Sequence, residues 1–178
     1  MKHKKFDFFK FINAALIIVG CVGFILPFLV LHKSNSSDNA SLTVSLASVA
    51  GYFRFLAGNK NQMFIDIALH NIAIAVFGFI ISFFSSGILG SLVLFLNLFV
   101  LGTVLFDIHT PFTIIFVMLE FIGICVAVFG GTYLSKKMVL QHASTKDIFK
   151  SSFFVVLFIA VTYFVAAFIE SNVILNQW

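Results

Sequence analysis

The sequence predicts an all-α integral membrane protein, a five-helix transmembrane bundle that forms one membrane domain over residues 1–178. Of its 178 residues, 61% are hydrophobic and only 10% are charged, and the mean hydropathy is +1.11, far outside the range of soluble globular domains. Apolar runs of about 20 residues recur, which is the length that a helix needs to cross a bilayer. Lysine and arginine stand mainly between these runs rather than inside them.

The length criterion selects five apolar stretches, expected at about 11–31, 63–84, 86–107, 110–134 and 152–175. The first follows a basic segment, as in a signal peptide. It is too long for that, and no clear small-x-small cleavage site follows, so we expect it to remain as an anchored first span. Pro27 predicts a kink within it.

The positions of lysine and arginine predict the orientation of the bundle. With the N-terminus in the cytoplasm, only Lys33, Arg54 and Lys60 lie outside. Because basic residues concentrate in cytoplasmic loops, we expect the N-terminus inside and the C-terminus outside. The residues then on the cytoplasmic side are Lys2, Lys4, Lys5, Lys10, Lys136, Lys137, Lys146 and Lys150.

Two segments between the spans carry patterns of their own. In the outer segment 32–62, five apolar residues recur at steps of three and four: Leu42, Leu46, Val49, Phe53 and Leu56. This spacing predicts a short amphipathic helix at about 41–57, either on the outer membrane surface and bundle mouth or packed on the domain as a connecting helix. The inner segment 135–150 is rich in lysine and is expected to be a basic cytoplasmic loop.

Six polar residues inside the predicted spans are the candidate binding residues. Ionisable groups at membrane depth are costly, and they usually face a bundle interior or a water-filled cavity. With the predicted orientation, all six fall in the middle or outer half of the membrane. They are Asp66, His70, Asn71, Asn97, Glu120 and Glu170.

Each of these residues also has a purely structural interpretation. The asparagines could link helices by hydrogen bonds, and Asp66 with His70, four residues apart, could form an ion pair on one helix face. Glu120 and Glu170 have no lysine or arginine within the spans, so each must be protonated, meet His70 or face water. We therefore expect Glu120 to point into the bundle, as one wall of a polar cluster made by the six residues.

Several function classes lack their motifs. The sequence contains no Walker loop, no HExxH, no GxSxG and no paired CxxC. Cys21 and Cys125 lie within apolar runs and are expected to pack there, so we expect no metal and no cofactor. The lysines form no interleaved basic and aromatic surface, which argues against nucleic acid. Five spans give no internal two-fold repeat, which disfavours a transporter.

A family resemblance rests on the order of polar and small residues. Residues 69–102, "LHNIAIAVFGFIISFFSSGILGSLVLFLNLFVLG", form an asparagine-led helix, a glycine-rich turn, and an asparagine before a final glycine. With the span-four glutamate and "AAFIESN" at 166–172, this order resembles the stage II sporulation protein M family of bacterial membrane proteins over roughly 63–175. The matching positions are Asn71, Gly78, Gly87, Gly90, Asn97, Gly102, Glu120 and Glu170.

The chain also departs from that pattern at two places. Ile115, Phe116 and Val117 stand where the family usually has Pro-His-Gly, and Leu98 follows Asn97 where a glycine is usual. These departures indicate an outlying member of the family, of the type found in circular-bacteriocin gene clusters.

The resemblance implies a multi-pass protein of the bacterial cytoplasmic membrane and two settings for it. Small members take part in maturation and secretion of circular bacteriocins, beside a larger multi-span protein and an ATPase. Other members scaffold peptidoglycan-degrading partners in endospore engulfment. The short chain and the altered motif favour the first setting, a membrane subunit for maturation and secretion of a small hydrophobic peptide.

The sporulation scaffold remains the alternative. A second alternative is an intramembrane enzyme that cuts or joins peptides, with Glu120, His70 and Asp66 as its catalytic candidates. Catalysis is not the expected role.

Overall fold

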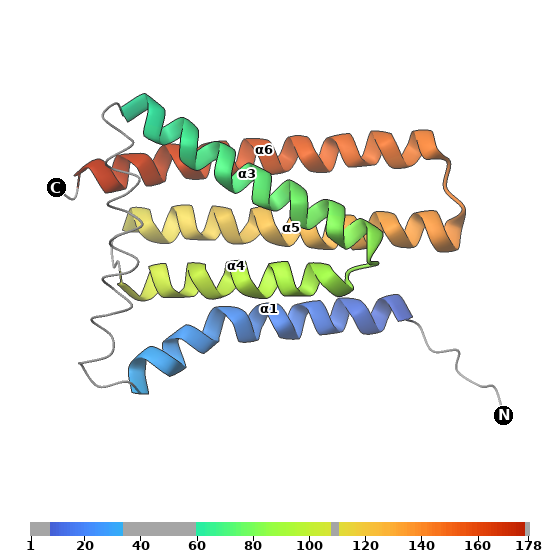
Figure 1. Ribbon diagram of the computed structural model, residues 1–178, viewed down its shortest axis with the longest axis horizontal. Helices are drawn as coiled ribbons and strands as arrows, with labels where there is room; N and C mark the ends of the chain where they lie inside the picture. The colour runs from blue at the N-terminus through green and yellow to red at the C-terminus, as the bar shows by residue number, and fades with distance from the viewer. Residues whose placement is uncertain (1–7, 34–59, 108–110, 177–178) are drawn as a thin grey trace.

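The computed structural model describes residues 8–33, 60–107 and 111–176, which are helical apart from two tight turns at 85–87 and 142–144 (Figure 1). The helices are α1 (Phe8–Lys33), α3 (Lys60–Phe84), α4 (Ile88–Asp107), α5 (Pro111–Gln141) and α6 (Thr145–Asn176). Because the described part contains only helices, the all-α class is confirmed. The amphipathic helix predicted at 41–57 lies outside the described residues.

The helices coincide with the predicted spans, and their composition suits a membrane. Four of them contain stretches long and apolar enough to cross a bilayer: Phe8–Pro27, Phe64–Phe84, Ile114–Gln141 and Thr145–Asn172. In α4 the apolar stretch is shorter and covers Ile88–Gly102. In α1 the helix continues through Pro27 and bends towards its C-terminal end (Figure 1), as expected for an interior proline.

The prediction that 135–150 is a loop is wrong. Helix α5 continues to Gln141 and α6 starts at Thr145, so most of this segment is helical. The Ser144 hydroxyl caps α6: it accepts a hydrogen bond from the Asp147 N–H at 3.2 Å and donates one to the Asp147 carboxylate at 2.7 Å. At the end of α5, His142 has φ +49° and the Ala143 N–H donates to the Lys137 carbonyl at 3.3 Å.

The helices form two groups joined side by side. Helix α1 pairs with α4, α3 packs across α5 and α6, and α4 contacts α5 (Figure 1). Helices α3 and α4 share the turn at 85–87 and diverge from there towards the opposite end of the bundle. Apolar side chains fill the core between the groups, among them Leu16, Leu94, Leu98, Ile124, Val128 and Ile159.

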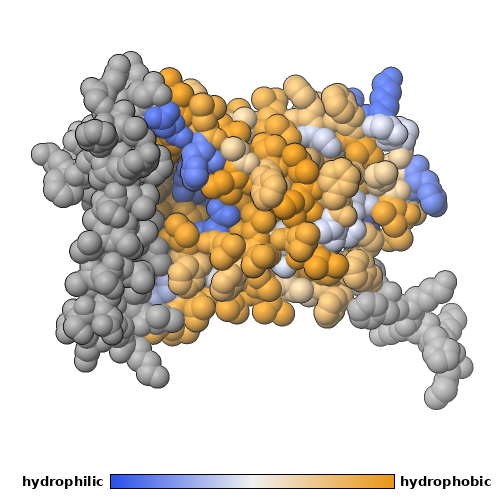
Figure 2. Space-filling view, viewed as in Figure 1, coloured by the Kyte–Doolittle hydropathy of each residue, from blue (hydrophilic) through white to orange (hydrophobic). Residues whose placement is uncertain are grey.

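The outer surface of the bundle is apolar around its middle. Figure 2 shows a broad hydrophobic band, with the hydrophilic side chains gathered towards the ends. Large apolar side chains point outward, such as Phe84 at 81% exposure, Leu29 at 65% and Ile18 at 63%. Such a surface is unstable in water and suited to lipid. We conclude that this is a membrane protein.

Both described turns and the start of α1 lie at one end of the bundle (Figure 1). Five lysines on α1, α5 and α6 also lie at this end: Lys10, Lys136, Lys137, Lys146 and Lys150. Lys33 and Lys60 end α1 and begin α3 at the other end. This distribution matches the one used to predict a cytoplasmic N-terminus, which stays a prediction.

Small residues bring α1 and α4 into backbone contact. A Cβ added at Gly102 would lie 2.6 Å from the Phe24 carbonyl oxygen, and one at Gly23 would lie 2.9 Å from the Phe95 carbonyl oxygen. A Cβ at Gly20 would lie 3.4 Å from the methyl groups of Leu94 and Leu98, an ordinary contact. Without a hydrophobic force between helices in lipid, such close packing holds this pair together.

The turn between α3 and α4 is fixed against α5. Gly87 has φ +93°, and a Cβ there would lie 2.6 Å from Thr132 Oγ1. Ser86, at φ +53°, shares a 2.9 Å hydroxyl–hydroxyl hydrogen bond with Ser135. The turn therefore needs glycine both for its backbone conformation and for space.

We predict that Gly102→Ala lowers the free energy of unfolding by about 1–3 kcal/mol, because the new methyl group meets a backbone oxygen that cannot move alone. Gly20→Ala, in the same helix pair, is the control and should change it by less than about 0.5 kcal/mol. Denaturant titration in mixed micelles measures both. Equal effects of the two substitutions would contradict the close α1–α4 contact.

The orientation can be tested with single cysteines in a variant that lacks Cys21 and Cys125. A membrane-impermeant maleimide added to intact cells should label Lys60→Cys, at the start of α3. It should label Lys146→Cys, at the start of α6, only after the cells are permeabilised. The reverse pattern would place the N-terminus outside.

Candidate functional site

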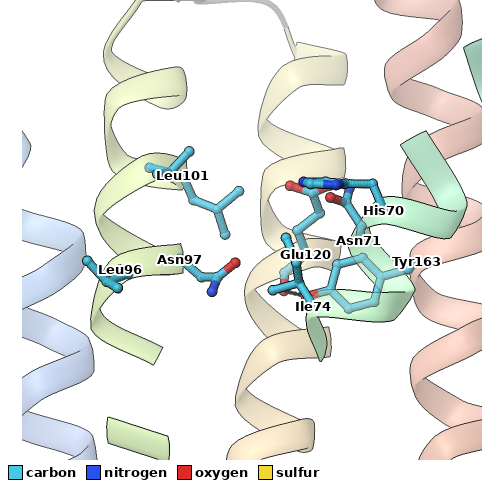
Figure 3. A pocket seen from close by; sticks show the side chains of 9 residues that line it. His70, Asn71, Ile74, Leu96, Asn97, Leu101, Glu120 and Tyr163 are labelled. Atoms are coloured by element: carbon cyan, nitrogen blue, oxygen red, sulfur yellow. Dashed lines mark hydrogen bonds between the residues drawn. The ribbon is translucent and has the colours of Figure 1, made fainter. Parts of the chain in front are cut away.

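A pocket of about 260 Å³ lies where α3 and α4 diverge, and side chains of four helices line it (Figure 3). Helix α4 supplies one polar and three apolar residues, α3 supplies three residues, and α5 and α6 supply one each. The lining residues are His70, Asn71, Ile74, Leu96, Asn97, Val100, Leu101, Glu120 and Tyr163. The pocket thus combines apolar walls with a few polar groups, which is typical of a binding site.

Glu120 points into the bundle, as the sequence predicted. It is 8% exposed, on the face of α5 that also carries the buried Phe116, Val117 and Ile124 one turn away on either side. The Asn71 side-chain amide of α3 donates a hydrogen bond to Glu120 Oε1. The buried carboxyl group is therefore held by a partner on another helix, and it forms part of the pocket wall (Figure 3).

Tyr163 of α6 lies directly beside this carboxyl-bearing turn. Its hydroxyl donates a hydrogen bond to the Glu120 backbone carbonyl at 3.1 Å. Gly123 gives the ring its place, since a Cβ at Gly123 would lie 2.5 Å from Tyr163 Cε2. Because residue 123 has no side chain, the Tyr163 ring can approach α5 closely enough for its hydroxyl to reach the Glu120 carbonyl.

The two asparagines behave differently. Asn71 forms a hydrogen bond to another helix, as the interpretation of the asparagines as links between helices predicted. Asn97 does not link helices through its amide nitrogen: Nδ2 donates to the Val93 carbonyl of its own helix at 2.8 Å. Figure 3 shows the Asn97 oxygen turned towards the side of the pocket where Glu120 lies.

Part of the pocket lining is exposed, on α3 and on α4. Leu96 and Val100 line it and are 54% and 52% exposed, and His70 is exposed as well. His70 of α3 and Glu120 of α5 both line the pocket (Figure 3). Leu96 and Val100 belong to the apolar stretch of α4, so this exposed part of the lining lies on a surface suited to lipid.

Four of the six predicted residues line the pocket, and two do not. Asp66 stands one turn before His70 on α3, outside the lining. Glu170 also lies outside it, but close enough to Glu120 for the two carboxyl groups to interact electrostatically. Its Oε2 atom is buried and has no hydrogen-bond partner among the described residues. Whether the six bind a ligand stays a prediction.

Sequence reasoning missed Tyr163 and identified Gly123 only as a small residue that packs against another helix. Tyr163 stands seven residues before Glu170, so both share one face of α6, and this spacing could have marked the tyrosine as inward-facing. Gly123 stands three residues after Glu120, but nothing in its spacing indicates an aromatic partner on α6.

The arrangement can hold a polar group of a ligand between helices. Within the described ranges, no three His, Cys, Asp or Glu side chains are grouped as metal ligands. His70 and Glu120 line the same pocket, whereas Asp66, the third catalytic candidate, lies outside it. Binding is therefore better supported by this geometry than a three-residue catalytic centre.

A double-mutant cycle tests the bond between Asn71 and Glu120. We predict that Asn71→Leu and Glu120→Leu show a coupling of about 0.5–1.7 kcal/mol in the free energy of unfolding, because each removes the other's hydrogen-bond partner between helices. The control cycle pairs Asn71→Leu with Thr132→Val, because Thr132 lies twelve residues, roughly 18 Å, along α5 from Glu120. The control should be additive. Additivity in both cycles would contradict a stabilising bond.

Comparison with known proteins adds the family. A family model described as Stage II sporulation protein M matches residues 14–173, so the match includes α1 as well as the resembling region 63–175. Neither the curated proteins nor the solved structures contain a match. The family match covers nearly the whole chain, and the protein therefore belongs to the Stage II sporulation protein M family.

Proposed function

We propose that this protein is a membrane subunit of a complex that matures and secretes a small hydrophobic peptide, of the circular-bacteriocin type. The observation that carries this proposal is a polar pocket between α3 and α4 whose lining includes exposed apolar residues of α4. A hydrophobic peptide dissolved in the bilayer would reach such a pocket directly from the lipid, without passing through water.

The size of the pocket limits what it would take in. At about 260 Å³ it falls below the ~300–1,000 Å³ of pockets that enclose drug-sized ligands. It would hold one end or one polar group of a peptide, while the remainder lies along the lipid-facing sides of α3 and α4. Those sides carry exposed apolar residues, among them Leu69, Phe77, Leu92 and Leu96.

Export against a gradient also needs an energy source. The sequence has no nucleotide-binding loop, so partners would supply it. The proposed complex therefore includes an ATPase and a larger multi-span membrane protein, with this chain as the subunit that receives the peptide from the bacterial cytoplasmic membrane.

The family description favours a second candidate. A Stage II sporulation protein could scaffold peptidoglycan-remodelling enzymes in a sporulating cell. In that case the opening between α3 and α4 would receive a transmembrane helix of a partner, and its polar groups would specify that helix. Peptide processing within the membrane is less well supported, because Asp66 lies outside the pocket.

Deletion and complementation in the native host separate these candidates. We predict that deleting the gene, or restoring it as Glu120→Ala, abolishes the mature peptide in the culture medium, measured by mass spectrometry. Ser82→Ala is the matched control: Ser82 is buried like Glu120 but lies outside the pocket, and it should restore the peptide. Immunoblotting of membranes must show equal amounts of each variant.

Unchanged secretion of the peptide after deletion would contradict the proposed function. A block in engulfment with normal peptide secretion would favour the scaffold instead.

A further inference from the structure

The two amides at the pocket are each engaged through their nitrogen, which leaves both amide oxygens as acceptors. Asn97 Nδ2 donates to the Val93 carbonyl, and Asn71 Nδ2 donates to Glu120 Oε1. The bond to Val93 fixes which end of the Asn97 amide is which, because a backbone carbonyl oxygen can only accept. The Asn97 oxygen is consequently the amide atom that faces Glu120 across the pocket (Figure 3).

Glu120 and Tyr163 add further acceptors. One carboxyl oxygen of Glu120 is engaged by Asn71, which leaves Oε2 as an acceptor when the group is ionised. The Tyr163 hydroxyl spends its single proton on the Glu120 backbone carbonyl, which leaves its lone pairs. On these four residues, acceptor oxygens therefore outnumber free donors, while His70, the fifth polar residue of the lining, can donate or accept.

The acidic groups near the pocket also favour a ligand with a positive charge. Glu170 adds a second carboxyl group close to Glu120, with a buried oxygen that has no hydrogen-bond partner among the described residues. Residues 61–135 and 151–178 contain no lysine and no arginine. A bound group that carries donors and a positive charge would satisfy both features of the site.

We propose that the pocket binds a primary ammonium group at the end of an apolar chain, with Glu120 as its counter-ion. An ammonium offers three donors and no acceptor, which complements the surrounding oxygens. On the proposed function, on which this step rests, the group is the N-terminal ammonium of the hydrophobic peptide. It would enter past Leu96 and Val100 while its apolar residues remain in lipid.

The test uses the full-length protein in nanodiscs of phosphatidylglycerol, a lipid without an amine. The probe is a synthetic ten-residue hydrophobic peptide with a photoreactive leucine at its second position, made with a free N-terminus and with an acetylated one. Mass spectrometry locates and quantifies the crosslinks. The free-amine peptide should crosslink to pocket residues such as Ile74 and Leu101, and acetylation should lower that yield by about tenfold or more.

Substitutions then assign the effect to the carboxyl group. Glu120→Gln should remove the difference between the two peptides, whereas Ser82→Ala should retain it. Dodecylamine should compete with the free-amine peptide, and dodecanol, of equal chain length, should not.

The outcomes separate this inference from the function it builds on. Equal crosslinking of both peptides at the pocket would overturn the ammonium inference and leave peptide binding intact. No crosslinking of either peptide at the pocket would overturn both. Loss of the free-amine crosslink when phosphatidylethanolamine is added would support an ammonium site but assign it to the lipid head group, and would overturn the peptide as its source.

Discussion

The lack of water at bilayer depth is the constraint on which the rest of this structure depends. A polar group there must find its partner within the protein, and the Asn71–Glu120 hydrogen bond is the clearest response to that requirement. It connects α3 to α5 beside the pocket. Tyr163 then ties α6 to the same turn of α5 through the Glu120 carbonyl. The turn of α5 that contains Glu120 thereby links the three helices α3, α5 and α6.

Helix packing and pocket formation follow from different residues. Where helices must touch, glycines allow backbone contact, at Gly23 and Gly102 between α1 and α4 and at Gly87 in the turn against α5. Where α3 leaves α4, larger side chains such as Leu96 and Leu101 border the pocket. The same chain therefore closes one side of α4 and leaves the other available.

The spans could be predicted because hydropathy over 20 residues is a local property of the sequence. The extension of α5 and α6 through a lysine-rich segment could not, because it depends on the cap at Ser144 and on each helix supporting the other. Polar residues in spans pointed to the site, since lipid penalises them. Their grouping depends on helix rotation, which the sequence does not specify, so Asp66 was included and Tyr163 was not.

The fixed turn between α3 and α4 would act as a pivot for movements of α4. Helix α4 has 20 residues, about 30 Å of helix, and one of its ends is held against α5 by the Ser86–Ser135 bond. A tilt of about 5° at that end would move the other by roughly 2–3 Å, simply from this length. Because α1 packs on α4 backbone to backbone at Phe95 and Gly102, a displacement of α1 would be passed to the stretch of α4 that lines the pocket.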